Sequence, residues 1–422
     1  MNITKKESSR RMKKKIIFFK IQSFSHINDN VEKILKANFS DCEIITVDLW
    51  KKIRKNILLF LMNLFAIVAY HGFDILLRRK QINECLFTTP FIFRKLRKIT
   101  YEYTNQKDVL FTFQTQSLFD GSHSSGSIKH FLYTDHTFIQ NLNYPDFKRT
   151  RMPSKTWLQF ERDIYNNADV NFTMSSNISN SLLGDYDISQ ENVQLIGAGS
   201  NIKLDPIMLE ERNYEAKRII FVGRDWKRKG GPILVSAFEK ILDVHPDAQL
   251  VIIGCKPDIH LKNVTITGGI SLNEVSKYYS QSSIFCLPTR IEPFGIVFLE
   301  AMMYSLPVVA TNVGAIPDFI GEENGILVEP NNVEQIYEAL LKLLNDISLC
   351  RNLGKQGFKK YQENYTWEKV GLKMAASIKT VLFKNEKSPD TLYNHKQTNS
   401  IQSKPKHLTG FINANFKNNT LL

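Results

Sequence analysis

The second half of the chain alternates short β-branched runs with helical segments, and this pattern limits the fold more than any other feature. RIIFVG, QLVIIG, VTIT, SIFCL and PVVAT are predicted strands, and helical stretches such as PILVSAFEKIL and NVEQIYEALLKLLND lie between them. Strands that are joined by helices run parallel, because a parallel pair needs a long crossover connection. We therefore predict an α/β fold built on a doubly wound parallel sheet.

The first half carries the same alternation in a weaker form. Strands are predicted at Ile16–Phe19, at Glu43–Val47 and in DVLFTF, HFLYT and VNFTM, and helices around residues 30–37 and 91–103 and in WLQFERDIYNNA. The two blocks meet near residues 200–215. The sequence thus predicts two Rossmann-like domains, each with a parallel sheet.

The predicted organisation has five parts. They are a basic tail (1–13), a first Rossmann-like domain (14–210), a second Rossmann-like domain (211–365), a helix that crosses back to the first domain (366–383) and a polar, Asn-rich tail (384–422). The composition of the last part is typical of disordered segments.

The positive charge of the chain is concentrated in its first quarter. Residues 1–100 contain 21 Lys and Arg against 8 Asp and Glu, whereas the other 322 residues contain 34 of each. Such a region predicts either an anionic partner, with a membrane surface foremost, or a merely solvated basic face. Nucleic acid is not expected, because basic and aromatic residues do not interleave as they do in known nucleic-acid-binding modules.

A strongly apolar run, Ile57–Tyr70, lies between the basic clusters KKIRK and RRK. Fourteen helical residues reach about 21 Å, less than the roughly 30 Å of a bilayer core. The run is therefore interpreted as a core helix or as a segment that dips into a membrane surface, and not as a span. Only IIFF follows the basic start, which does not predict a secretory signal peptide. With five scattered cysteines and no CxxC pair, we expect a cytoplasmic protein, peripheral on the membrane if residues 1–100 bind lipid.

The segment GRDWKRKGG directly follows the predicted strand RIIFV. It places Arg224 and Lys229 after the strand and Gly230–Gly231 at the start of the next helix. Cations beside a helix N-terminus suit a diphosphate, because the helix dipole and the free amides also favour an anion. A solvated basic turn is the alternative.

Two glutamates lie close together in PTRIEPFGIVFLEAMM. Glu292 stands in the loop before a helix, with Pro293 suited to the first turn and Phe294 and Gly295 offering backbone N–H groups. Glu300 interrupts an apolar helical stretch. An unpaired buried carboxylate costs several kcal/mol. We therefore expect Glu300 to be bound either by a ligand or by a salt bridge to Arg224 or Arg290.

These segments resemble the family 4 glycosyltransferases, retaining enzymes of the GT-B fold. GRDWKRKG is followed about sixty residues later by EPFGIVFLEA, whose two glutamates, separated by seven residues, match the EX7E motif of that family. YTDHTF, NADVNFTMS and IGAGSN are similar to segments of the family's amino-terminal domain. The resemblance covers roughly residues 105–375. It implies two Rossmann-like domains that face each other across a cleft, the second binding a nucleotide sugar.

The resemblance also implies residue roles. Arg224 and Lys229 match the pair that neutralises the nucleotide diphosphate, Glu292 matches the carboxylate that faces the hydroxyls of the donor sugar, and Glu300 matches the residue that binds the ribose. The remaining positions that match the family's donor-binding backbone are Gly223, Phe294, Gly295 and Ile296.

Asp135 and His136 follow the predicted strand HFLYT. Family members commonly have the order His-Asp here, so either residue is a candidate to contact the sugar or the acceptor. A helix cap formed by Asp135 is the alternative. Asp185 and Asp187, which bracket Tyr186, are interpreted as a polar turn, and the resemblance implies neither a metal nor another cofactor.

The function implied by the resemblance is retaining transfer of a sugar, by family habit a hexose, from a nucleotide-diphosphate donor. The acceptor would be a glycan or a lipid-linked acceptor, as in polysaccharide, O-antigen-type or glycolipid synthesis. Two alternatives stay open: a non-catalytic lipid- or nucleic-acid-binding protein on a transferase scaffold, and another GT-B enzyme such as a nucleotide-sugar epimerase.

Overall fold

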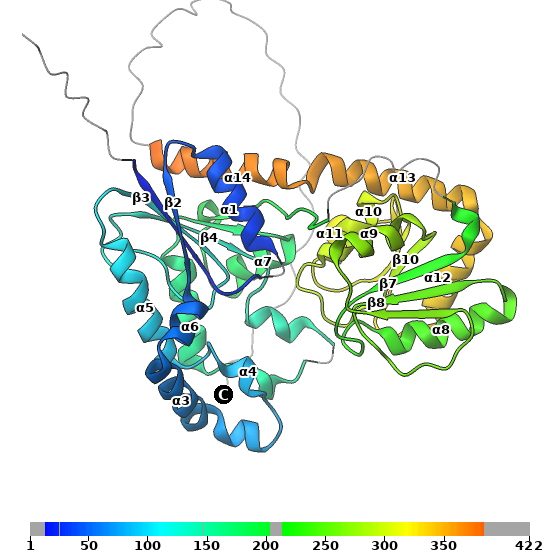
Figure 1. The fold of residues 1–422 in the computed structure, drawn as a ribbon, viewed down its shortest axis with the longest axis horizontal. Helices are drawn as coiled ribbons and strands as arrows, with labels where there is room; N and C mark the ends of the chain where they lie inside the picture. Colours follow the sequence, from blue (N-terminus) through cyan, green and yellow to red (C-terminus); the bar gives the residue numbers. More distant parts are fainter. Residues whose placement is uncertain (1–12, 25, 146, 203–212, 384–422) are drawn as a thin grey trace, which may run out of the picture. The chain divides into compact units, whose positions relative to one another are not determined.

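The computed structural model describes residues 13–24, 26–145, 147–202 and 213–383. These residues form two six-stranded sheets with flanking helices (Figure 1). The predicted C-terminal tail, nearly all of the predicted N-terminal tail and most of the predicted junction near residues 200–215 lie outside the described residues.

The first sheet has the strand order β2-β1-β3-β4-β5-β6, and every neighbouring pair is parallel. Its strands are β1 (Lys15–Lys20), β2 (Glu43–Asp48), β3 (Val109–Thr115), β4 (Lys129–Thr134), β5 (Val170–Thr173) and β6 (Val193–Leu195). The helices of this half are α1 (Ile27–Asn38), α2 (Leu49–Lys55), α3 (Ile57–Leu76), α4 (Ile82–Cys85), α5 (Pro90–Thr104), α6 (Lys155–Asn166) and α7 (Ser176–Gly184).

The second sheet has the order β12-β11-β10-β7-β8-β9, again with parallel pairs throughout. Its strands are β7 (Arg218–Val222), β8 (Gln249–Ile253), β9 (Val264–Gly268), β10 (Ile284–Leu287), β11 (Val308–Thr311) and β12 (Gly325–Val328). The helices that follow these strands are α8 (Gly231–Val244), α9 (Leu272–Ser280), α10 (Ile296–Met303), α11 (Ile316–Phe319), α12 (Val333–Asn345), α13 (Ile347–Asn364) and α14 (Trp367–Phe383).

The strand order fixes where the second sheet can hold a ligand. The chain passes from β7 outward through β8 and β9 and then returns to place β10 on the other side of β7. The point between β7 and β10 is therefore the topological switch point, and ligands of open parallel sheets bind there, at the carboxyl ends of the strands. The loops 223–230 and 288–295 both begin at this edge, as the sequence predicted.

Aromatic side chains fill much of the core of the first half. Phe18 packs edge-on against Phe113 at 6.0 Å between ring centroids, and Phe113 stacks on Phe172 at 6.3 Å. All three rings are fully buried. Alternate residues of a strand share one face, so these rings from β1, β3 and β5 cover one side of the sheet with apolar surface, and burial of that surface is the main driving force for folding.

Several contacts join elements of the two sheets. In α7 the backbone N–H of Ser176 donates to Asp318 of α11 at 2.6 Å, so a carboxylate lies at a helix N-terminus, where the dipole favours it. The hydroxyl of Tyr365, just before α14, donates to the carbonyl of Asp318 at 3.2 Å. The helix α14 packs on α1, where Gly371 lies against Ile34.

Two predicted boundaries were wrong. The helix predicted to start at Pro293 begins three residues later, at Ile296, after Gly295 in the left-handed conformation (φ 96°). The apolar run predicted as fourteen residues belongs to a twenty-residue helix, α3, which continues to Leu76. By length and composition α3 could cross a membrane, although 28% of its most apolar stretch is buried in the protein.

Candidate active site

The loop after β7 turns sharply into α8. Gly223 directly follows the last residue of β7, and its N–H donates to the carbonyl of Ile253 at 2.9 Å. Gly230 has φ 74°, and a Cβ atom at this position would lie 1.9 Å from the carbonyl oxygen of Pro288. Only glycine allows this approach. The close approach brings the loop after β7 against the loop after β10.

Lys229 and Glu292 form an ion pair across these two loops. Both side chains are buried, with relative exposures of 10% and 6%. Burial lowers the pKa of Lys229, and the neighbouring Glu292 acts in the opposite direction. The pair joins the ends of β7 and β10 at the switch point, and its buried charges depend on each other for compensation.

Arg228 reinforces the same junction. Its guanidinium donates to the carbonyl of Ile291 at 2.7 Å, and its own carbonyl accepts from the N–H of Arg290 at 2.9 Å. No pattern in the sequence distinguished Arg228 from the other cations of GRDWKRKGG. We interpret it as the residue that holds the Glu292 loop against the Lys229 loop.

Glu300 is buried in α10, away from the ion pair. Its carboxylate accepts a hydrogen bond from the hydroxyl of Tyr279 at 3.2 Å, and a backbone group of Asn201 also lowers its pKa. Burial outweighs both and raises the pKa of Glu300 to about 8. No ion pair joins Glu300 to Arg224 in the part of the chain that the structure describes, so the alternative of a salt bridge between these two was wrong.

Asp135, which follows β4, lies close enough to Glu292 for the two carboxylates to interact. Burial, and to a smaller extent the charge of Glu292, raise the pKa of Asp135 to about 7. Tyr144 belongs to the same group, because burial, Glu292 and Asp135 all raise its pKa. The structure therefore brings a residue of the first sheet to the Lys229–Glu292 pair.

Tyr144 is a site residue that the sequence did not reveal. Its hydroxyl is buried and has no hydrogen-bond partner among the described residues. It lies beside Gly314, where a Cβ atom would be 3.1 Å from that hydroxyl and 2.0 Å from the carbonyl oxygen of Glu292. A buried hydroxyl without a partner costs free energy unless a ligand or water satisfies it. No sequence motif marks Tyr144.

His136 is held by its main chain. Its carbonyl accepts from the hydroxyls of Thr134 at 2.8 Å and Tyr165 at 3.3 Å, and the neighbouring Phe138 N–H donates to the buried Glu161 at 3.2 Å. Burial lowers the pKa of the imidazole to about 4, so the ring is neutral at physiological pH. Its Nδ1 atom has no partner within the described ranges.

The capping alternative for Asp135 was wrong. The next helical turn is a 3-10 turn at Ile139–Asn143, and Phe138 stands at its start without a side-chain cap. Asp185 and Asp187 form a turn at the end of α7, as predicted: Asp185 accepts from Ser181 at 2.7 Å, and Asp187 pairs with Arg162 at 2.7 Å.

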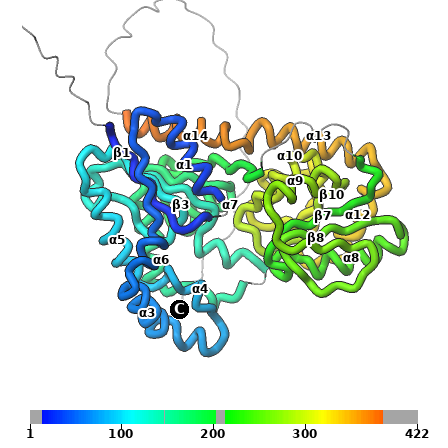
Figure 2. The backbone as a smooth tube through the Cα atoms, viewed as in Figure 1, coloured from blue at the N-terminus to red at the C-terminus, as the bar shows by residue number. Residues whose placement is uncertain are grey.

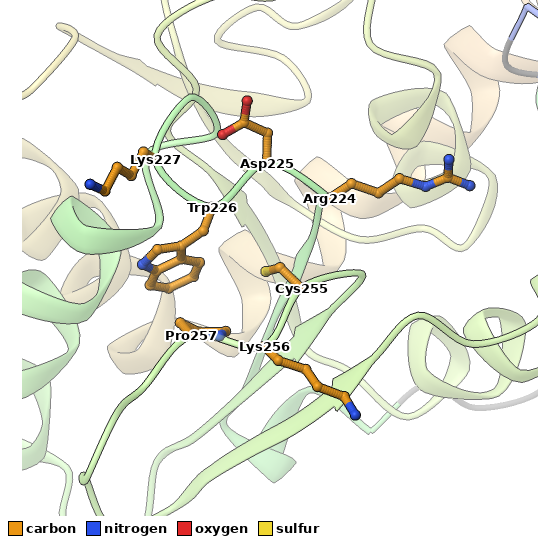
Figure 3. A pocket seen from close by; sticks show the side chains of 7 residues that line it. All are labelled: Arg224, Asp225, Trp226, Lys227, Cys255, Lys256 and Pro257. Carbon is orange, nitrogen blue, oxygen red and sulfur yellow. The ribbon is translucent and has the colours of Figure 1, made fainter.

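Arg224 lies apart from the ion pair, on an open pocket of about 560 Å³. Trp226, Cys255, Lys256 and Pro257 line the same pocket. Figure 3 shows Arg224 and Lys256 extending toward one side, with Trp226 and Pro257 on the other. Arg224 is exposed and has no acidic partner among the described residues. Its guanidinium is thus available to an anion at the end of β7.

Three of the positions predicted to bind the donor lie at or just before the start of α10. Phe294 is buried in the core, Gly295 precedes α10, and a Cβ atom on Gly295 would be 3.0 Å from the side chain of Glu292. The N–H of Ile296, the first residue of α10, is one of the groups that a helix start leaves without an intrahelical acceptor. The amides at this helix end therefore face the same edge as Glu292.

Solved structures share the whole fold. A sucrose-phosphate synthase from Thermosynechococcus elongatus superposes with a TM-score of 0.61 at 19% identity and covers 88% of this chain and 100% of its own. Anabaena HepE in complex with UDP and glucose gives a TM-score of 0.59 at 12% identity, with coverages of 87% and 100%. The predicted fold class is confirmed: the two parallel sheets form the GT-B fold.

The second sheet also matches a protein family by sequence. Residues 210–360 match the family described as Glycosyl transferases group 1. An uncharacterised glycosyltransferase of Methanocaldococcus jannaschii is 33% identical over 156 residues, which cover 36% of this chain and 44% of that protein. A phosphatidyl-myo-inositol mannosyltransferase of Propionibacterium freudenreichii is 30% identical over 190 residues, with coverages of 44% and 50%. The chain spans about half the length of the curated relatives it matches.

Proposed function

We propose that this protein is a glycosyltransferase that moves a sugar from a nucleoside-diphosphate donor to a glycan or lipid-linked acceptor, with retention of anomeric configuration. The observation that carries the proposal is the buried Lys229–Glu292 pair at the switch point between β7 and β10. The match of residues 210–360 to the group 1 family supports it. Anabaena HepE is also known in complex with UDP-glucose, which makes a hexose donor the first candidate.

The leaving diphosphate is the group that the loop after β7 would stabilise. Charge grows on the diphosphate as the glycosidic bond breaks, so cations and helix amides aimed at it lower the barrier more than they strengthen ground-state binding. Arg224 is open to solvent at this edge, and the N-terminus of α8 adds its dipole. Lys229 adds a second positive charge. Together these groups would neutralise the charge of the diphosphate, so the proposal includes no metal ion.

Lys229 and Glu292 would then exchange partners. In the free protein each neutralises the other. When the diphosphate engages Lys229, the carboxylate of Glu292 becomes available to the hydroxyls of the donor sugar, which can donate to it. The pair therefore couples phosphate recognition to sugar recognition. Gly223 and Gly295 would let the same ligand approach the backbone closely, and the backbone N–H of Ile296 would donate to it.

Asp135, His136 and Tyr144 are proposed to face the transferred sugar or the acceptor hydroxyl. The neutral imidazole of His136 and the hydroxyl of Tyr144 each offer a hydrogen-bonding atom that lacks a partner among the described residues. The raised pKa of Asp135, about 7, suits a group that takes up or releases a proton near neutral pH. Glu300, with Tyr279 and Asn201 beside it, is proposed to bind the ribose.

Two measurements test this function. A thermal-shift panel of nucleoside-diphosphate sugars should reveal one donor whose saturation at about 100 times its Kd adds about 2.7 kcal/mol to the free energy of unfolding. Incubation of that donor with acceptor glycans should then give a glycosylated product. If the donor is isomerised and not transferred, the protein is an epimerase. If no nucleotide sugar stabilises it, a non-catalytic role replaces the proposal.

A further inference from the structure

The helix α3 exposes most of its large apolar side chains and buries two polar ones. Its buried residues form one stripe, Leu59, Asn63, Ala66, Ile67 and His71, which packs against α4 and α5. Two of the five are polar, and the amide of Asn63 donates to the carbonyl of Leu86 at 2.9 Å. A surface helix of a globular protein normally buries its apolar side chains and exposes its polar ones.

The exposed face of α3 is apolar. Phe65, Phe73 and Leu76 have exposed fractions of 77%, 70% and 79%. The other large apolar residues exposed on this helix are Ile57, Leu58, Leu61, Met62, Val68 and Tyr70. Single exposed apolar residues are ordinary, but a contiguous patch of this kind marks a surface that another apolar phase covers. Figure 2 shows α3 at the margin of the first half, beside α4 and α5.

A groove of about 580 Å³ separates α3 from α5. Met62, Phe65 and Ala69 of α3 line one wall, and Arg94, Lys95 and Lys98 of α5 line the other. None of the three cations pairs with an acidic side chain in the described part of the chain. The apolar face therefore meets a row of unneutralised positive charges along its edge, to which the basic residues of α2 add more.

We propose that this face docks on an anionic lipid bilayer. The helix α3 lies along the interface with its exposed apolar side chains between the lipids, and Arg94, Lys95 and Lys98 contact headgroup phosphates. Apolar burial and attraction to anionic lipid together characterise such interfacial helices. The inference is independent of the sugar-transfer proposal, since it rests on α2, α3 and α5 and not on the loops after β7 and β10.

Two other arrangements fit the structure less well. A membrane span of α3 is long enough, at roughly 30 Å for twenty residues. It would, however, pull Asn63 and His71 away from their contacts and into lipid, where unsatisfied polar groups are costly. A symmetric dimer through α3 would place the same cationic edge on both partners, and like charges facing each other oppose association.

The test is co-sedimentation of the full chain with phosphatidylcholine vesicles, with and without phosphatidylglycerol. We expect binding only to the anionic vesicles, and weaker binding in high salt because the charges are screened. Phe65→Asp/Phe73→Asp should weaken binding at least about tenfold. The matched control, Leu195→Asp/Leu372→Asp, places the same charges at exposed leucines outside this face and should bind as the natural chain does.

The charge component has its own pair of variants. Arg94→Glu/Lys98→Glu should abolish the preference for anionic vesicles, and Lys369→Glu/Lys373→Glu, with the same spacing on α14, should not. Thermal unfolding confirms that each variant is folded. Binding that is absent, or unchanged by salt and by both variants, overturns the proposal. So does a dimer in gel filtration that Phe65→Asp/Phe73→Asp separates, and so does membrane-bound protein that resists an alkaline wash, as a span would.

Discussion

Glu292 and Glu300 are two buried carboxylates that follow β10, Glu292 in the loop and Glu300 in α10. Their side chains face groups of different charge. Glu292 faces the ammonium group of Lys229. Glu300 faces neutral groups, the hydroxyl of Tyr279 and a backbone group of Asn201, and its pKa rises to about 8. The first site therefore holds its charge with a cation of its own, whereas the second disfavours charge in the free protein.

The difference predicts which groups a ligand has to supply at each of the two carboxylates. A ligand at Glu292 has to supply an anion for Lys229, because separating the pair would otherwise leave an uncompensated buried charge. A ligand at Glu300 only has to supply hydrogen bonds, since a carboxyl without a cation gains from any added donor. A sugar diphosphate meets the first requirement, and the vicinal hydroxyls of a ribose meet the second.

The largest expected effect is the loss of one partner of the ion pair. Lys229→Ala should lower the free energy of unfolding by about 3–5 kcal/mol, because Glu292 then remains buried without its cation. Lys229→Met/Glu292→Gln removes both charges and should cost much less. Urea denaturation measures both variants. Equal losses in the single and double variants would show that the charges are not interdependent.

The next-largest expected effect is the pH dependence of stability that Glu300 contributes. A carboxyl whose pKa is raised in the folded state stabilises that state at low pH and loses this contribution as the pH rises toward the folded-state pKa. Glu300→Gln removes this pH-dependent loss of stability. Between pH 5 and pH 7 the free energy of unfolding of the variant should therefore rise by about 2–3 kcal/mol relative to that of the natural chain. A difference that stays constant over this range would contradict the raised pKa of Glu300.

A smaller effect is expected from the hydrogen bond between Tyr279 and Glu300. Tyr279→Phe removes the hydroxyl that donates to Glu300 and should lower the free energy of unfolding by about 1 kcal/mol. Because the hydroxyl favours the charged carboxylate, its removal should also raise the pKa of Glu300 further, and the decline in stability should extend to higher pH. Urea denaturation at several pH values follows both changes, and an unchanged pH profile would mean that the hydroxyl does not act on the carboxylate.

Local sequence patterns predicted the second sheet well, because each of its strands and helices has a recognisable pattern within one short segment. RIIFV, QLVII and IFCL became β7, β8 and β10, and Gly230–Gly231 stood where α8 begins. The start of α10 was missed because Pro293 suits a first helical turn but here precedes a left-handed Gly295. A turn of this kind depends on the neighbouring loop and not on local preference.

The length of α3 was underestimated for a related reason. The apolar run ends at Tyr70, yet the next residue, His71, lies on the same buried stripe as Asn63 and Ile67. The stripe becomes recognisable only once α4 and α5 are in place. Tyr144 beside Gly314 could not be predicted either, since that contact joins segments far apart in the sequence and neither carries a motif.

The roles assigned to the site residues and the five-part division of the chain stay predictions. What the structure adds is geometry: it joins Lys229 to Glu292, brings Asp135 near them and leaves Arg224 open on its own pocket. The sequence pattern alone left a solvated turn as an alternative for this loop. Burial of Lys229 makes that alternative a poor description of the residue.

The turnover of Arg224→Ala with its identified donor tests the account most directly. Arg224 is exposed and lacks an acidic partner in the described part of the chain, so its removal should change the free energy of unfolding by no more than about 0.5 kcal/mol. If the guanidinium stabilises the departing diphosphate, kcat should fall about 10²–10³-fold. Turnover equal to that of the natural chain would contradict the claim that this edge of the second sheet grips the donor diphosphate.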